Sequence, residues 1–158
     1  MINPGVLNQI SFKKESTWGT AVVPDKSLAV KPTVGIFTNQ DIKELQAIKN
    51  QLAKVYDAYA GMRKHEGDYG LDLFPDYPGY ALVSAFGTNV DATKGGESIV
   101  FTHTLSEAAA IPSLTIEQAI GANGENVRRF AGCICDCFKL SVKSGDVVTL
   151  TPKFQAKT

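Results

Sequence analysis

Apolar and polar residues alternate along much of the chain, and this period of two is typical of β-strands. The alternation is clearest near the C-terminus, where two apolar sets flank a turn at residues 144–146: Ile134, Phe138, Leu140, Val142, Val148, Leu150 and Phe154. The opposite face carries Lys139, Ser141, Lys143, Thr149, Thr151, Lys153 and Gln155. The pattern predicts a hairpin with one face in the core and the other in water.

Three further segments show the strand pattern, at residues 6–14, 99–105 and 113–120. In the first, Phe12 can reach the core, and in the last, Leu114 begins an apolar set that alternates with polar neighbours. Glycine and proline divide the chain into short segments. The sequence therefore predicts a mainly β domain.

Glycine and proline also suggest where other segments turn or end. Pro32 confines the short apolar segment 28–30 to an edge strand or to irregular structure. Residues 54–73 predict a hairpin whose turn lies in the polar stretch 63–67. Residues 89–98 include two adjacent glycines and predict an exposed loop.

Apolar residues recur at helical spacing in two places. Pro75 can occupy the first turn of a helix, an apolar stripe follows it, and Gly87 has the chemistry that ends a helix. In residues 41–55, Ile42 and Leu45 begin a second helical pattern. Periodicity alone predicts a helix there as well, although the neighbouring segments resemble strands.

Charge and length narrow the classes of function. The chain has 16 basic and 16 acidic residues, whereas dedicated nucleic-acid-binding proteins carry a basic surplus. Its 158 residues, 44% of them hydrophobic, predict one domain over residues 1–158. No apolar run approaches the ~20 residues that span a bilayer, and the first residues lack a signal-peptide pattern. We therefore expect no membrane association.

Few residues are candidates for catalysis or metal binding. Cys133, Cys135 and Cys137 alternate, so on a strand their thiols would share a face at spacings of about 6.6 Å, too far for one tetrahedral ion unless the strand bulges. His103 has no triad partner at a suggestive spacing. No phosphate-binding loop, dinucleotide fingerprint or nucleophile elbow is present. The sequence predicts no enzyme, no cofactor and no metal; a metal-binding cysteine face is the alternative to simple packing.

Five short motifs follow one another along the chain. They are residues 12–21 (FKKESTWGTA), residues 67–69 (GDY) leading into the predicted helix at Pro75, residues 101–104 (FTHT), residues 112–117 (PSLTIE) and residues 129–133 (RFAGC). In this order and at this spacing, they resemble the major tail tube proteins of long-tailed, siphovirus-like bacteriophages.

The resemblance implies an antiparallel β-sandwich or half-barrel with one flanking α-helix, which assembles into stacked hexameric rings. The stack would form the hollow tail tube through which DNA is ejected as a passing cargo. Other tail proteins, namely the tape measure, tail tip and terminator, would be partners. The protein would be found in the virion after assembly in the host cytoplasm. In this family the region corresponding to residues 41–55 tends to be extended, which weakens the helix prediction there.

The resemblance also implies candidate site residues. An extended N-terminal loop, at about residues 15–53, would reach neighbouring subunits, with contacts at Glu15, Trp18, Thr20, Ile42 and Leu45. The polar face of the last hairpin is a candidate lumen wall, comprising Lys139, Ser141, Lys143, Thr149, Thr151 and Lys153. Strand alternation alone is equally compatible with this face being ordinary outer surface.

Two other kinds of function remain as alternatives. A tail terminator or a tube-like secretion component would form a single ring and stop there. A ligand-binding β-sandwich would be a monomer or dimer with an enclosed apolar pocket.

Overall fold

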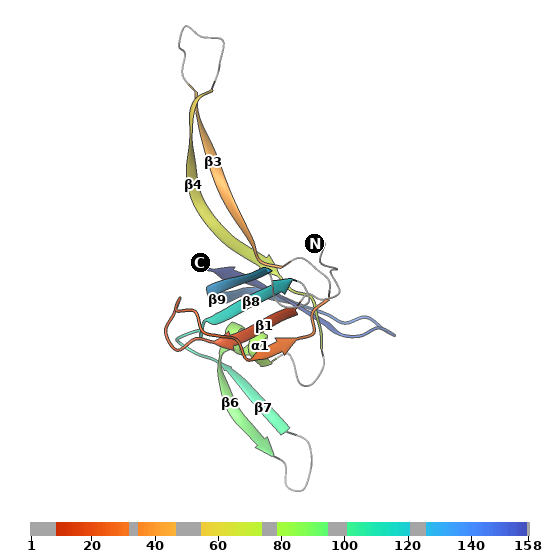
Figure 1. The fold of residues 1–158 in the computed structure, drawn as a ribbon. Helices are drawn as coiled ribbons and strands as arrows, with labels where there is room; N and C mark the ends of the chain where they lie inside the picture. Colours follow the sequence, from red (N-terminus) through yellow and green to blue (C-terminus); the bar gives the residue numbers. More distant parts are fainter. Residues whose placement is uncertain are drawn as a thin grey trace.

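The computed structural model describes residues 9–31, 35–46, 55–73, 79–94, 101–120 and 126–157 (Figure 1). The elements in these ranges are β1 (Gln9–Lys14), β2 (Lys26–Leu28), β3 (Phe37–Gln46), β4 (Val55–Asp68), β5 (Leu71–Asp72), α1 (Gly79–Phe86), β6 (Gly87–Lys94), β7 (Phe101–Glu107), β8 (Leu114–Ile120), β9 (Asn126–Ser141) and β10 (Thr149–Ala156). The predicted fold class is confirmed: the described chain is mainly β, its strands pair antiparallel, and α1 is the one helix within these ranges.

Most of the strands belong to one open sheet. Its order is β2, β1, β8, β9, β10, β4 and β3, and β5 also pairs with β10. β9 joins two halves of the sheet, because its first half pairs with β8 and its second half with β10. The register shifts in both of these ladders. At the register shift between β8 and β9, Gly132 has a φ of +66°, a conformation that glycine adopts without strain. Such bulges bend a sheet, which suits a half-barrel better than a flat layer.

Three aromatic rings from distant parts of the sequence form the centre of the core. Phe12, Tyr69 and Phe154 are at most 1% exposed, and their ring centroids lie 5.8–6.1 Å apart. Edge-on and tilted contacts of this kind are those that aromatic pairs prefer. Leu114 and Ile116 of β8 are buried in the same cluster. The sequence predictions that Phe12 and Leu114 belong to the core are confirmed.

The helix packs against the sheet and is attached to β9. It buries Ala81 and Ser84, and Ser84 Oγ accepts a 3.2 Å hydrogen bond from the backbone N–H of Cys135. The helix ends at Phe86, and Gly87 follows with φ +96°, the left-handed conformation typical of a helix C-terminus. The predicted helix end is confirmed, and the predicted start at Pro75 lies outside the described residues.

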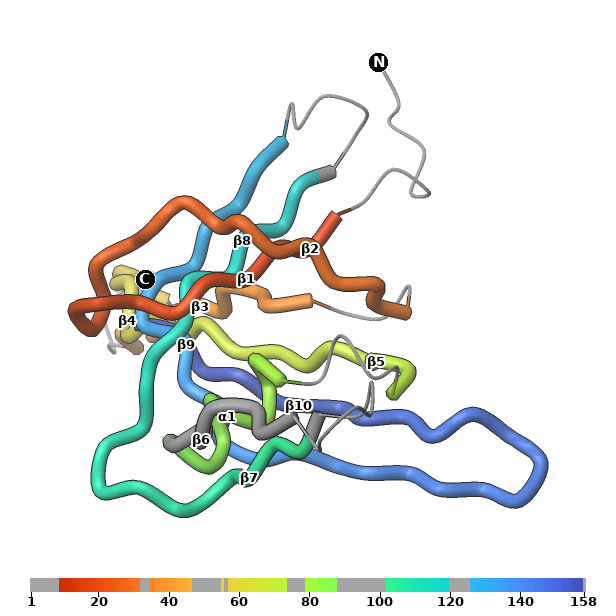
Figure 2. Tube along the Cα trace, turned by 90° about the horizontal axis from the view of Figure 1, so that it is seen from below, coloured from red at the N-terminus to blue at the C-terminus, as the bar shows by residue number. Residues whose placement is uncertain are grey.

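Three hairpins extend from this body. β3 and the part of β4 paired with it form a long ribbon, residues 37–46 and 55–66, which we call the arm. β6 and β7 form a separate two-stranded sheet on the opposite side of the body (Figure 1). The end of the β9–β10 hairpin projects in a third direction (Figure 2). Within the described residues, no helix has the length and apolar character needed to cross a membrane.

Three predictions of local structure are wrong. Residues 41–46 belong to strand β3 and not to a helix; the remaining residues of that prediction up to 54 lie outside the described ranges. β4 continues through residues 63–67, so no turn occurs there, and its hairpin partner is β3. Residues 89–94 belong to β6 and not to a loop. The helix prediction failed because β3 is exposed along its whole length. Its apolar residues therefore do not alternate with polar ones as they would on a half-buried strand.

The last hairpin agrees with its prediction on one strand but not on the other. Leu150 and Phe154 of β10 are buried as predicted, but Phe138, Leu140 and Val142 are exposed. The single face predicted for the cysteines is also wrong, because Cys133 and Cys135 are buried whereas Cys137 is exposed. The register shift between Cys137 and Cys135 separates them.

Candidate functional site

The loop after β1, residues 15–25, is fixed to the body by the buried side chain of Glu15. We call this segment, which is the first part of the loop predicted at about residues 15–53, the N-terminal loop; β2 and β3 follow it. Oε1 of Glu15 accepts hydrogen bonds from Thr115 Oγ1 and Gly132 N, both at 2.8 Å. Oε2 accepts from Ser113 Oγ at 2.6 Å and from Gly19 N at 2.8 Å. One carboxylate thus joins the loop, β8 and the bulge in β9.

These hydrogen bonds decide the charge state of Glu15. Burial by itself would raise the pKa of the carboxyl group, because it removes water from the charged form. The hydrogen bonds from Gly132, Ser113, Thr115 and Gly19 stabilise that charged form, and the net result is a pKa below the ordinary value. Glu15 was predicted as an inter-subunit contact, and the structure places its carboxylate inside its own subunit.

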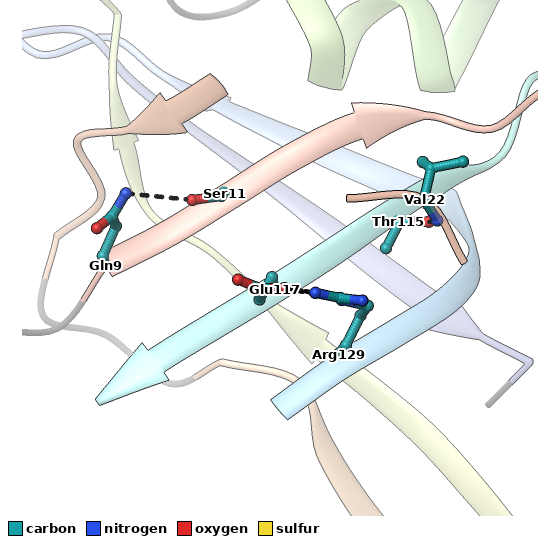
Figure 3. A network of polar contacts seen from close by, with 6 residues as sticks. All are labelled: Gln9, Ser11, Val22, Thr115, Glu117 and Arg129. Carbon is teal, nitrogen blue, oxygen red and sulfur yellow. Dashed lines mark hydrogen bonds and ion pairs between the residues drawn. The ribbon is translucent and has the colours of Figure 1, made fainter. Parts of the chain in front are cut away.

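The other two candidate contacts of the N-terminal loop lie on its outside. Trp18 is 57% exposed, and Nζ of Lys157 lies 4.4 Å from the centre of its ring, a cation–π distance. Thr20 is exposed, and its backbone N–H donates to Thr17 O. Val22 N donates to Thr115 Oγ1 at 3.1 Å, so the loop is held against β8 (Figure 3). Trp18 and Thr20 are accessible to a neighbouring molecule.

Trp18 also borders a hollow of about 540 Å³. Ile111, Ile134 and Ala156 supply apolar walls, and Asp136 and Gln155 supply polar groups. The hollow is open to solvent and is not the enclosed apolar cavity that a ligand-binding β-sandwich would have. Among the described residues, no group of three or more His, Cys, Asp or Glu side chains could hold a metal ion.

The arm carries the other two candidate contacts, Ile42 and Leu45. They are 68% and 46% exposed, and all ten residues of β3 are exposed. Tyr59 and Met62 on the paired strand are also exposed, at 51% and 75%. These apolar side chains therefore have no cover from the described part of their own chain.

The root of the arm is tightly fixed. Ile36 is fully buried, and its backbone N–H donates to the hydroxyl of Tyr69 at 3.4 Å. The same hydroxyl accepts a 2.5 Å hydrogen bond from Gln118 Nε2 of β8. At Gly67 the two chain segments cross so closely that a Cβ atom would lie 2.2 Å from Gly35 O. The direction of the arm is therefore set by the core.

The register of the last hairpin brings most of the predicted lumen residues to one face. Ser141 pairs with Thr149, Lys139 pairs with Thr151, and Lys153 occupies the next position of that face on β10. Lys143 lies in the turn, outside the strands. Nζ of Lys153 is 3.4 Å from a carboxylate oxygen of Glu66 on β4, an exposed ion pair.

The apolar surface formed by Phe86 and Phe138 was not predicted from the sequence. Their rings lie 5.8 Å apart, and both are more than a third exposed. The strand alternation did mark Phe138 as apolar, but it placed the residue in the core. The exposed ion pair between Arg129 and Glu117, at 2.7 Å, was also not anticipated (Figure 3).

The comparison with known families decides what kind of molecule carries these surfaces. The family model described as phage tail tube protein matches residues 5–158. The chain belongs to the phage tail tube protein family. The predicted resemblance is thus confirmed, and this family membership supports a structural role in a phage tail.

Solved structures agree with this tail tube assignment at the level of the fold. The chain is similar to a protein in the cryo-EM structure of the anti-feeding prophage baseplate, 6-fold symmetrised, with a TM-score of 0.58 and 10% sequence identity. The match covers 100% of this chain and 95% of the other. At this identity the likeness concerns the fold alone. No curated protein matches the chain.

Proposed function

We propose that this tail tube family member assembles into stacked hexameric rings that form the tube of a phage tail. The observation that carries the proposal is the family match over residues 5–158. The six-fold symmetry of the baseplate with a similar fold supports rings of six. The role is structural and not catalytic, and it needs no cofactor.

The exposed parts of the molecule support assembly with further copies. The arm presents Ile42 and Leu45, and the N-terminal loop presents Trp18 and Thr20, on surfaces that the described chain leaves uncovered. Exposed apolar groups of this size are typical of protein interfaces. We assign these residues to contacts between subunits or between rings, with Glu15 holding the loop in position.

We assign the polar face of the β9–β10 hairpin to the lumen. Lys139, Ser141, Thr149, Thr151 and Lys153 share this face or lie along it, and Lys143 follows in the turn. DNA would pass this wall during ejection without specific binding. This face carries three lysines, of which Lys153 is paired with Glu66, so its affinity for DNA should depend on salt concentration although the whole chain has equal numbers of acidic and basic residues.

The other components of a tail complete the set of partners. A tape measure protein would occupy the lumen before ejection, and tail-tip and terminator proteins would contact the two ends of the tube. The finished protein would be located in the virion, after assembly in the host cytoplasm.

Electron microscopy of the purified protein tests the proposal directly. Negative staining should show rings with six subunits and, at high concentration or with tail-tip complexes, stacks of rings. Native mass spectrometry should show hexamers. Only monomers under all conditions, even with tail-tip complexes present, would contradict the proposal, and single rings that never stack would indicate a terminator or a secretion component instead.

A further inference from the structure

Lys157, just after β10, lies across the N-terminal loop. Its Nζ atom is 4.4 Å from the centre of the Trp18 ring. Its backbone N–H donates to Ala131 O at 3.0 Å, so this part of the chain is held beside the bulge in β9. Lys157 thus connects the loop with β9 and with the end of β10, although it is far from Trp18 in the sequence.

Two glycines make room for the stem of Lys157. A Cβ atom at Gly19 would lie 2.8 Å from Lys157 Cδ, and one at Gly132 would lie 2.9 Å from Lys157 Cβ and 3.3 Å from Trp18 Nε1. Both glycines have a positive φ, and both of their N–H groups donate to the carboxylate of Glu15. Glu15 therefore fixes the backbone on which the lysine packs.

The contact with Lys157 leaves much of the Trp18 side chain accessible. Trp18 is 57% exposed and borders the open hollow together with Ile111 and Ile134. A side chain that is free to change rotamer loses this freedom when a partner buries it, and the loss weakens binding. A ring that its own subunit already holds in place avoids most of this loss.

We propose that Lys157 is a positioning residue, which holds the Trp18 ring in the orientation in which it contacts a neighbouring subunit. This inference rests on the proposed function, which assigns Trp18 to such a contact. The stem of a lysine can pack on a surface while its ammonium group stays in water. An ammonium group over an aromatic face is attracted by the ring, and tryptophan gives the strongest attraction of this kind.

Fluorescence tests the positioning in unassembled subunits. Trp18 is the one tryptophan of the chain, so the signal reports on this ring alone. Lys157→Ala should lower the fluorescence anisotropy of Trp18 and increase its quenching by acrylamide. Lys157→Arg should preserve both values, because a guanidinium group also stacks on aromatic rings. The matched control is Lys26→Ala, at an exposed lysine of β2, which should change neither value.

A second variant separates the charge of Lys157 from its packing. Lys157→Gln keeps most of the stem on the two glycines and removes the ammonium group, so it should change the fluorescence in the same direction as Lys157→Ala. A change in Lys157→Ala alone would show that only the stem matters and would overturn the proposal. Unchanged fluorescence in both variants would overturn it as well.

A double-mutant cycle tests the consequence for assembly. Lys157→Ala should raise the critical concentration for ring formation about 2- to 10-fold, the usual effect of one side chain that must be ordered on binding. Lys157→Arg should restore it. In a Trp18→Ala background, Lys157→Ala should have no further effect, because the two residues act through one contact.

The outcomes separate this inference from the proposed function. Equal effects of Lys157→Ala with and without Trp18 would show that the lysine acts independently of the ring and would overturn the positioning role. Rings that form at the same critical concentration in Trp18→Ala or Lys157→Ala would also overturn it and leave the tube function standing. Failure of the unaltered protein to form rings under any condition would overturn both.

Discussion

The Glu15 carboxylate is buried, charged and fully hydrogen-bonded, an arrangement that needs all of its partners. Each oxygen accepts from one backbone N–H and one hydroxyl group. An amide in the same place would have to direct its NH₂ group at either Gly19 N or Gly132 N, and a donor would then face a donor. This position therefore requires a carboxylate, and a neutral amide of the same size cannot replace it.

Glu15→Gln should lower the free energy of unfolding by about 3 kcal/mol, because it leaves a buried backbone donor without an acceptor. Urea denaturation followed by circular dichroism measures this change. Glu44→Gln on the exposed arm is the matched control, with an expected change within about 0.5 kcal/mol. Equal effects of the two substitutions would show that Glu15 is not an anchor.

The contribution of Glu15 should also depend on pH. The pKa of this carboxyl is lowered in the folded protein, so on acidification the unfolded chain takes up the proton first. The difference in unfolding free energy between unaltered protein and Glu15→Gln should be complete above about pH 4.3 and should shrink as the pH falls through the folded pKa. Denaturation curves between pH 3 and pH 7 measure it, and a constant difference over that range would contradict the assignment.

The cysteines should differ sharply in reactivity. Burial raises the pKa of Cys133 to about 12 and that of Cys135 to about 11, so neither forms much thiolate near neutral pH. Iodoacetamide at pH 8 should therefore label the exposed Cys137 in the folded protein and all three cysteines after unfolding. Mass spectrometry counts the labels; rapid labelling of Cys133 in the native protein would contradict the structure.

Among the elements, the arm depends on the crossing at its root. Gly67 and Gly35 bring two backbone segments together where no side chain fits, and Tyr69 holds Ile36 beside them. The core, together with the pairing of β4 residues 65–68 with β10, therefore sets the direction of the arm. A change at the root would alter where the arm tip lies in an assembly.

Gly67→Ala should destabilise the protein by about 1–3 kcal/mol, because the new Cβ atom would overlap Gly35 O. Gly79→Ala is the control: nothing lies within 4 Å of its Cβ position, and it begins the helix, so the change should be within about 1 kcal/mol and stabilising in direction. Thermal unfolding compares the two. If Gly67→Ala were as harmless as the control, the close crossing would not exist.

The elements also show what the sequence can and cannot predict. Buried strands such as β8 keep a regular alternation, because one face must be apolar, and their positions were predicted well. β3 has no face buried within its own described chain, so its apolar residues are not constrained to alternate. Their spacing of three residues is therefore that of a helix. The same reason applies to Phe138 and Leu140. Their alternation with polar residues was predicted correctly, but no described part of the single chain buries them. Of the candidate site, the polar face of the hairpin followed from alternation, whereas the Glu15 anchor needed contacts between residues far apart in sequence.

For the whole molecule, stability should be distributed unevenly between the body and the arm. Backbone amides in β1 and β8 lie between paired strands, whereas β3 pairs on one side only. In isolated subunits, hydrogen exchange should be slow in β8 and fast in the outer part of β3. On assembly, protection should rise in β3 and stay unchanged in β8. Mass spectrometry of exchanged peptides measures this, and an arm that is equally exposed in tubes and in subunits would contradict its role as a contact.

The continuity of β9 has a mechanical consequence. This strand runs without interruption from the bulge at Gly132, where Glu15 holds it, to the exposed end of the hairpin. A pull on the hairpin along the strand axis would load the hydrogen bonds of its ladders together and in shear, not one after another. In a tube, tension applied to this hairpin would pass along a single covalent chain toward the core of the subunit. At the inner end of the strand, the hydrogen bond from Gly132 N to the buried Glu15 carboxylate would resist this tension.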